Sequence, residues 1–198
     1  MIPRSFTFTP TGLAALRAAQ IVAPKTKQLA GHRPQLCCAC LDLDNMALVA
    51  TDGGRLLHSP IRWDIDVMSD THVGGGYLIP ADALAHIAKL KTNAVLVSFT
   101  TSAVLVTASG TFTTTSFATV SLPYPDWTRL RGGAPAAVSA FGIVPSQWAD
   151  FEKLRKVLGA RASVPVRFYG DGSACRAMFQ VGDQEHTLYV MPTRIGPK

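Results

Sequence analysis

The sequence predicts an α+β protein built from three copies of one unit, in which a strand, a short helix and two or three further strands follow one another. Runs of β-branched and apolar residues, bounded by turn residues, recur after each helical segment. The glycine-rich stretches 74–76 and 132–135 separate the copies. We expect the strands to join into larger antiparallel sheets with the helices packed on one face. The alternative is an unrelated α+β fold in which the repeat is accidental.

The first unit begins with a strand at 5–8, where apolar and polar side chains alternate. Thr9 is available as a helix cap, and Pro10 is tolerated in a first helical turn. The alanine-rich run 12–23 then predicts a helix, which Pro24 stops. Three strands complete the unit, at 36–43, 47–51 and 55–61, with turns at Asp44–Asn45 and at 52–54.

The second and third units repeat this order. Unit two is expected to hold a strand at 77–79, a helix at 80–91 and strands at 95–99, 103–108 and 111–120, with a turn at Ser109–Gly110. Unit three is expected to hold a strand at 138–143, a helix at 147–158 ended by Gly159, and strands at 164–169, 174–181 and 186–191, with Asp171–Gly172 as a hairpin turn. The units group into a domain over 1–131, made of 1–70 and 71–131, and a half-domain over 132–198.

The composition is that of a folded protein. The 198 residues suffice for one large or two small domains. Hydrophobic residues make up 47% and charged residues 16%, which excludes a disordered chain. Nineteen Lys and Arg against thirteen Asp and Glu give a net charge of +6. That balance favours a polyanion such as nucleic acid as a partner, although a protein can also simply be basic. No apolar run is long enough to cross a membrane, and residues 1–5 lack the apolar stretch of a secretory signal.

No group of residues follows a catalytic or metal-binding pattern. The five histidines show no HxxxH or HExxH spacing, and GxSxG and Walker motifs do not occur. Cys37, Cys38 and Cys40 lack the spacing and the companion pair of a zinc site, so buried apolar thiols are the favoured interpretation. The aspartates of 64–70 have no EF-hand frame. We therefore expect no enzyme activity, no metal and no cofactor.

Three segments carry a more specific signal when they are taken together. They are Val49–Leu56 (VATDGGRL), Tyr124–Arg129 (YPDWTR) and Tyr189–Arg194 (YVMPTR). Their order and spacing resemble the signature segments of the bacterial DNA sliding clamp, the beta subunit of DNA polymerase III. Units one and two resemble the middle domain of that clamp, and unit three resembles its last half-domain.

The resemblance implies a DNA-clamp fold, with outer antiparallel sheets and inner helices that line a central hole. It implies a polymerase processivity factor, nucleoid-associated in the cytoplasm, that encircles double-stranded DNA without reading its sequence. A clamp chain has six units and its ring has twelve, whereas this sequence has three units. Four chains would therefore close such a ring, with unit three completing its domain through a unit of another chain, for which an isologous contact is one solution.

The resemblance also implies a pocket that binds short apolar peptides of polymerase and clamp loader. Its apolar side chains would form a trough in which methionine adapts to different partners. Its threonine and arginine side chains would fix the peptide backbone and acidic groups. The pocket carried over from the family consists of Leu36, Thr51, Gly53, Arg55, Leu56, Pro125, Arg129, Leu130, Val190, Met191, Pro192, Thr193 and Arg194. The alternative is that these segments are only a hairpin turn and a final core strand.

Basic side chains lie opposite the apolar stripes of the expected helices. On the second helix the stripe is Leu84, Ile87 and Leu90, and on the third it is Trp148, Phe151, Leu154 and Leu158. The free face of the first helix is expected to hold Ala14, Ala15 and Ala18. The DNA-facing set is Lys25, Lys27, His86, Lys89, Lys153, Arg155 and Lys156. A solvated charged face is the alternative for these residues.

Two other functions are weighed against the encircling clamp. A clamp mimic or regulator would sequester clamp-binding partners without encircling DNA, and an intact pocket suits it equally well. A sequence-specific DNA-binding protein is disfavoured because no helix-turn-helix or finger motif occurs. The mass of the protein in solution separates the clamp from the mimic.

Overall fold

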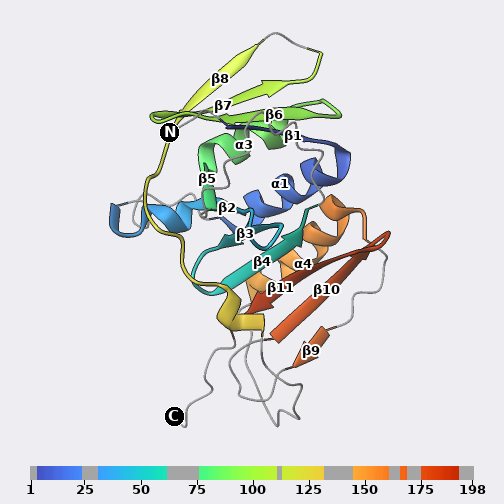
Figure 1. Ribbon diagram of the computed structural model, residues 1–198. Coiled ribbons are helices and arrows are strands. Elements are labelled where there is room, and N and C mark those ends of the chain that lie inside the picture. Colours follow the sequence, from blue (N-terminus) through green and yellow to red (C-terminus); the bar gives the residue numbers. More distant parts are fainter. Residues whose placement is uncertain are drawn as a thin grey trace.

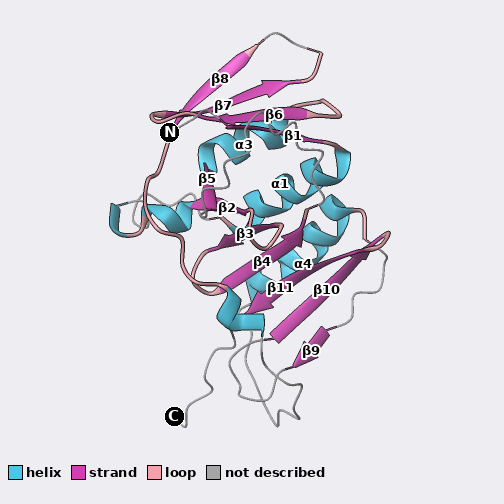
Figure 2. Ribbon diagram, viewed as in Figure 1, coloured by secondary structure: helices cyan, strands magenta, loops and turns pink. Residues whose placement is uncertain are grey.

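The computed structural model describes residues 4–23, 31–61, 76–110, 113–131, 145–160, 166–168 and 175–191. In this part of the chain, two antiparallel sheets wrap around the helices, and Figure 1 shows α1, α3 and α4 on the inner side of both sheets. Figure 2 shows the helices and strands of this arrangement, and along the chain each of the helices α1, α3 and α4 is followed by several strands. The predicted α+β class with outer sheets and inner helices is confirmed.

The elements follow the predicted unit order. The helices are α1 (Pro10–Val22), α3 (Ala81–Lys89) and α4 (Pro145–Leu158), with short 3-10 helices η1 (Pro34–Cys37) and η2 (Thr128–Arg131). The strands are β1 (Arg4–Phe8), β2 (Cys38–Asp42), β3 (Ala47–Thr51), β4 (Arg55–Pro60), β5 (Gly76–Pro80), β6 (Val95–Phe99), β7 (Ala103–Ala108), β8 (Thr114–Ala118), β9 (Val166–Phe168), β10 (Cys175–Val181) and β11 (Gln184–Val190).

Units one and two exchange their first strands. The four-stranded sheet has the order β1-β6-β7-β8, so the first strand of unit one lies in the sheet of unit two, with Phe8 opposite Val95. The seven-stranded sheet has the order β5-β2-β3-β4-β11-β10-β9, so the first strand of unit two lies in the sheet of unit one. Unit three joins through β4 and β11, where Arg55 lies opposite Val190.

One large core lies between the helices and the inner faces of both sheets. Helix α1 packs against α3 and α4 on its two sides and against β3 and β4. The prediction that Ala15 and Ala18 lie on a free face is therefore wrong, because both are buried. Their small side chains allow the neighbouring helices to approach α1 closely.

Several predicted boundaries shift for local reasons. The strand predicted from residue 36 begins at Cys38, because Pro34 opens the 3-10 turn η1. Helix α3 ends at Lys89 instead of residue 91, and α4 begins at Pro145 instead of residue 147. Thr9 occupies the N-cap position of α1, but its side chain makes no capping hydrogen bond. The predicted strand 138–143 and the turn at 171–172 lie outside the described residues.

Two glycines permit the chain to turn after β3 and after α4. Gly53 has a φ of 89° in the turn between β3 and β4, a conformation that is cheap only for glycine. The Asp52 carboxylate accepts hydrogen bonds from the backbone N–H groups of Gly54 and Arg55 and fixes this turn. Gly159, with a φ of 71°, ends α4 as predicted.

Candidate functional site

The first and third signature segments lie side by side. They meet along the pairing of β4 with β11, where Leu56 is opposite Tyr189. Beyond the end of β11, the Met191 N–H donates a hydrogen bond of 2.8 Å to the Gly54 carbonyl oxygen. The turn after β3 and the residue that follows β11 are therefore held together by backbone contacts.

The second signature segment packs on the outer face of the same strands. Trp127 is buried there, and its Nε1–H donates to Asp42 Oδ2 at 2.9 Å. The Tyr124 hydroxyl donates to the carbonyl oxygens of Cys38 and Val49 at 3.5 and 3.4 Å. We call the buried apolar group at this place the outer-face cluster; it consists of Ala47, Val49, Leu56, Trp127 and Tyr189, with Tyr124 packed against it.

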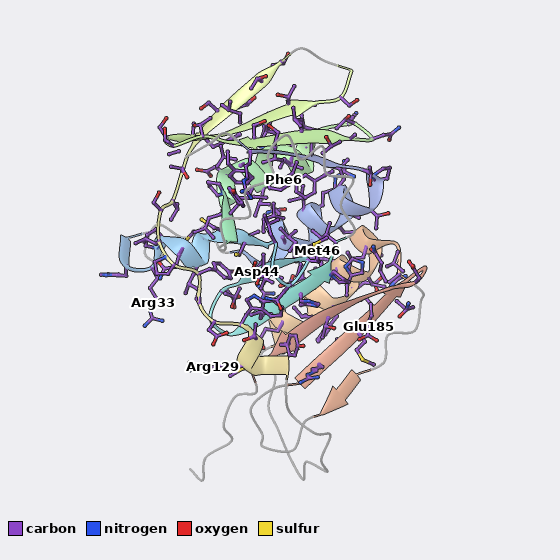
Figure 3. All side chains as sticks on the ribbon, viewed as in Figure 1. Phe6, Arg33, Asp44, Met46, Arg129 and Glu185 are labelled. Atoms are coloured by element: carbon purple, nitrogen blue, oxygen red, sulfur yellow. The ribbon has the colours of Figure 1, made fainter. Side chains whose placement is uncertain are left out.

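The predicted pocket residues differ in how accessible they are. Met191 is 40% exposed next to the outer-face cluster, whereas Leu56 is only 5% exposed within it. Val190 is fully buried in the core on the other side of the sheet, and Leu36 and Thr51 are also buried. Pro125 and Arg129 are exposed, and Figure 3 shows Arg129 on η2, near the end of β11. The side chain of Leu130 and residues Pro192, Thr193 and Arg194 lie outside the described part.

The sequence-based set omitted Trp127 and Tyr189, which supply the aromatic part of the cluster. Tyr189 alternates with Leu188 and Val190, which lie in the core on the helix side. This period of two places Tyr189 on the outer face, so strand alternation could have identified it. Trp127 has no such signal, because it lies in a segment without regular structure.

Arg55 is held by ion pairs within the fold. Its Nε lies 2.9 Å from Asp52 Oδ2, and its Nη1 contacts Asp150 of α4. Lys153 also bonds to Asp150, at 2.9 Å. Burial would raise the pKa of Asp150, but the hydrogen bonds and charges of Lys153 and Arg55 outweigh it and lower the pKa. Arg55 therefore links unit one to unit three.

Arg129 is paired near the exposed end of the site. Its Nε donates to Asp126 Oδ2 at 2.9 Å. Hydrogen bonds from Thr128, followed by those from Arg129, lower the pKa of Asp126. Because the Arg129 side chain is largely exposed, its guanidinium can exchange this carboxylate for an acidic group of a ligand at small cost.

Comparisons with known proteins find the same architecture in solved structures. No protein-family model matches the chain, and no curated protein matches it. The DNA polymerase sliding clamp of Bacillus subtilis superposes with a TM-score of 0.73 at 17% sequence identity, over 97% of this chain and 64% of that chain. The chain has the fold of a bacterial DNA sliding clamp.

Two other solved structures support the same fold. The DNA polymerase III subunit beta of Borrelia burgdorferi gives a TM-score of 0.70 at 11% identity, over 97% of this chain and 64% of that chain. The Helicobacter pylori beta clamp bound to a DNA ligase peptide gives 0.70 at 13% identity, over 98% of this chain and 67% of that chain. The chain thus spans about two thirds of the length of the clamps whose fold it shares.

Within this clamp fold, α4 presents basic side chains away from its buried face. Phe151, Leu154 and Leu158 are buried, as predicted, whereas Lys153 and Lys156 are exposed. The side chain of Trp148 lies outside the described part of the structure. Glu152 contacts Arg155 at 2.7 Å and Lys156 at 3.3 Å, and hydrogen bonds from Arg155 lower the pKa of Glu152 to about 2. One carboxylate therefore offsets part of the positive charge of this face.

The other predicted DNA-facing residues are placed differently. Lys89 is exposed in the last turn of α3. His86 is half-buried, with its ring 5.6 Å from that of Phe117 in β8, so it packs toward the sheet. This placement differs from the predicted free face, because the aromatic ring of Phe117 offers an apolar contact. Lys25 and Lys27 lie outside the described residues.

The described residues contain no cluster of three or more His, Cys, Asp or Glu side chains that could bind a metal. Burial raises the pKa of Cys38 and of Cys40 to about 12, which keeps both thiols protonated and unreactive at neutral pH. None of the helices in the described ranges combines the length and the apolar character that crossing a membrane requires.

Proposed function

We propose that the chain is a sliding clamp, a polymerase processivity factor that encircles double-stranded DNA. It holds polymerase and clamp-loader peptides where the three signature segments meet, which we call the outer-face site. The observation that carries the proposal is the convergence of three distant signature segments at one place in a clamp fold. A chance resemblance of three short segments has no reason to bring them together. The proposal assigns no catalytic role and no cofactor to the chain.

The outer-face site has the chemistry of a peptide-binding surface. The apolar and partly aromatic outer-face cluster is buried beneath it, and Met191, two residues after Tyr189, is exposed. Methionine adapts its shape to varied apolar side chains. Arg129 supplies an exposed cation at the rim for an acidic residue of the peptide. The proposed pocket retains the family-derived residues, including Pro192, Thr193 and Arg194.

The exposed sides of α3 and α4 are proposed to face DNA. Lys89, Lys153 and Lys156 are accessible there, and α1 holds the two helices on either side of it. Loose contacts between lysines and phosphates suit a protein that slides, because they carry no sequence information. Arg155, Lys25 and Lys27 belong to the same proposal, whereas the ring of His86 packs toward Phe117 of the sheet.

The proposed ring contains four chains. A two-unit domain over 1–131 and a half-domain over 132–198 supply three units per chain, and twelve units close a clamp ring. Unit three then completes its domain with the corresponding unit of another chain. Such a ring holds DNA by topology, so a tight complex with the double helix is not required. We propose that it works at the nucleoid in the cytoplasm.

The decisive test is the mass in solution, followed by retention on DNA. We expect light scattering over a range of concentrations to give a stable mass of four chains. After loading, the protein should remain on closed circular DNA at high salt and leave when the circle is linearised. A persistent monomer, or equal loss from circular and linear DNA, would rule out encirclement and favour the mimic.

Replacing Met191 with alanine should weaken binding of a clamp-binding peptide about tenfold, the equivalent of about 1.4 kcal/mol. The substitution removes apolar surface from an exposed side chain, so the fold should remain stable. Leu56→Ala is a poorer test of peptide binding, because Leu56 is buried. Its truncation should lower the free energy of unfolding by about 2–3 kcal/mol. Fluorescence anisotropy with a labelled peptide measures the effect.

The matched control for this variant is Met46→Ala. Met46 is similarly exposed, but it lies at the other end of β3, in the turn that follows β2, and Figure 3 shows it apart from Arg129. Peptide affinity should be unchanged in this control. If the Met191 variant and the parent bind the peptide with equal affinity, Met191 is not part of the peptide-binding site.

Replacing Glu152 with glutamine should strengthen non-specific binding of short linear DNA several-fold at low salt. The change releases Arg155 and Lys156 from the carboxylate that contacts both. The gain should shrink as salt is added, because screening weakens exposed charges. Anisotropy titrations at several salt concentrations measure it. Glu185→Gln in β11 is the control, with the same charge change on an exposed strand residue. An equal gain in both variants would show that only net charge matters.

A further inference from the structure

The strands of this chain pair according to their place in a unit. The first strands β1 and β5 pair with β6 and β2, the strands that follow the helix of the other unit. The last strands of units one and three, β4 and β11, pair with each other. This last pairing is antiparallel, from Thr187 opposite His58 to Val190 opposite Arg55. Last strands thus meet last strands across the junction of two units.

The last strand of unit two, β8, has no such partner within the described residues. It ends the four-stranded sheet, with β7 as its neighbour and Ala103 opposite Ala118. Figure 1 shows β8 at the rim of the molecule, on the side away from β9 and β10. The backbone groups along its outer edge are therefore positioned to pair with a further strand.

The sequence of β8 lacks the features that protect natural edge strands. Thr114–Ala118 reads TTSFA and contains no charged residue and no proline. Edges that must stay free usually carry lysine, proline or a bulge. Thr114, Ser116 and Ala118 are exposed on one side, and Phe117 on the other side packs against the core. Both faces of β8 are thus built like those of a strand within a sheet.

We propose that β8 pairs antiparallel with β8 of a second copy of this chain, across a twofold axis. The proposal rests on the proposed ring and identifies one of its contacts between chains. A twofold axis follows because the same strand contributes from both copies. The two four-stranded sheets then become one sheet, as β4 and β11 join two units within the chain. The strand at the end of the other sheet, β9, is the first strand after helix α4, just as β2 is the first strand after α1. By analogy with β2, we expect β9 to pair with the first strand of another unit rather than with a last strand.

Charge substitutions on β8 test the twofold contact. Thr114→Glu/Ser116→Glu and Thr114→Lys/Ser116→Lys each place like charges opposite one another when a strand pairs with its own copy. We expect each variant alone to have half the mass of the parent, and an equal mixture to regain the full mass. Thr101→Glu/Ser102→Glu, in the exposed turn between β6 and β7, should keep the mass of the parent. Unchanged mass in both β8 variants, or no recovery on mixing, would overturn the proposal.

A second measurement does not depend on the stability of the charged variants. Ser116→Cys, treated with a short bismaleimide, should give covalent dimers on a denaturing gel, whereas Ser102→Cys and the parent should not. Absence of this cross-link would overturn the β8 contact. Retention of the parent on closed circular DNA reports separately on the proposed function. A parent that is retained on circles but does not use β8 would leave the clamp function standing and overturn this contact alone.

Discussion

Replacing Asp150 with alanine should lower the free energy of unfolding by about 3 kcal/mol, the usual scale for removing one partner of a largely buried ion pair. The side chains of Asp150 and Arg55 are 13% and 12% exposed, and Asp150 also accepts a hydrogen bond from Lys153. Without this carboxylate, the Arg55 guanidinium stays poorly solvated with Asp52 as its remaining acidic partner among the described residues. Urea denaturation at neutral pH measures the loss.

The effect should be specific to the contact between unit one and unit three. Glu152→Ala removes an exposed carboxylate from the same helix and should cost less than about 1 kcal/mol. Hydrogen exchange should show that α4 and the turn 52–54 lose protection together in the Asp150 variant. Equal costs for the two variants would show that the Arg55 pair contributes no more than a surface pair.

The pH dependence provides a check on the same contact. The pKa of Asp150 is lowered in the folded protein, so folding favours its charged form. The contribution is therefore complete above the unfolded pKa of about 3.9 and is lost as pH falls through the lower folded pKa. The stabilities of the parent and of Asp150→Ala should converge in strong acid.

Acidification from pH 7 to pH 5 should lower the free energy of unfolding by about 2 kcal/mol through His186 alone. His186 is 1% exposed, and neither ring nitrogen has a hydrogen-bond partner among the described residues. Burial lowers its pKa from 6.5 to about 4, because the charged ring would lose its hydration. Between these two pKa values, His186 is protonated in the unfolded chain but not in the folded chain. The free energy of unfolding therefore falls as the pH drops from 6.5 to 4 and is constant above this window.

His186→Leu should remove most of this pH dependence. An apolar side chain needs no hydrogen bond, so stability at pH 7 should change little. Thermal unfolding at pH 7 and pH 5 compares the variant with the parent, and His32→Gln, an exposed histidine, is the control. The same loss at pH 5 in the His186 variant and in the parent would assign the acid sensitivity to other groups.

Local patterns predicted the elements of the fold but not their partners. Strands 47–51, 95–99 and 103–108 have the predicted bounds, because apolar runs end there at turn residues. The exchange of β1 and β5 has no local signal, since the paired residues of β1 and β6 are 87 to 95 positions apart and those of β2 and β5 are 34 to 42 positions apart. Burial of Ala15 and Ala18 depends on two other helices, which a single helical pattern cannot reveal.

For the candidate site too, the sequence predicted which segments take part but not all of the side-chain contacts between them. The order of three motifs predicted which segments converge, and backbone contacts such as Met191 with Gly54 agree with it. The Arg55–Asp150 pair was not predicted, because its members are 95 residues apart and surface arginines are common. Trp127 shows its role only when the outer face of the sheet is assembled, whereas alternation along β11 could have placed Tyr189 on that face.

The exchange of first strands also determines how this chain can fold during synthesis. When β1 leaves the ribosome, its neighbour β6 has not been made, and β2 likewise precedes β5 by more than thirty residues. Neither sheet can be completed until both units have emerged, so the two units must fold as one step. The nascent chain therefore carries unpaired β1 and β2 edges for most of the translation of this domain, a period in which we expect it to depend most on chaperones.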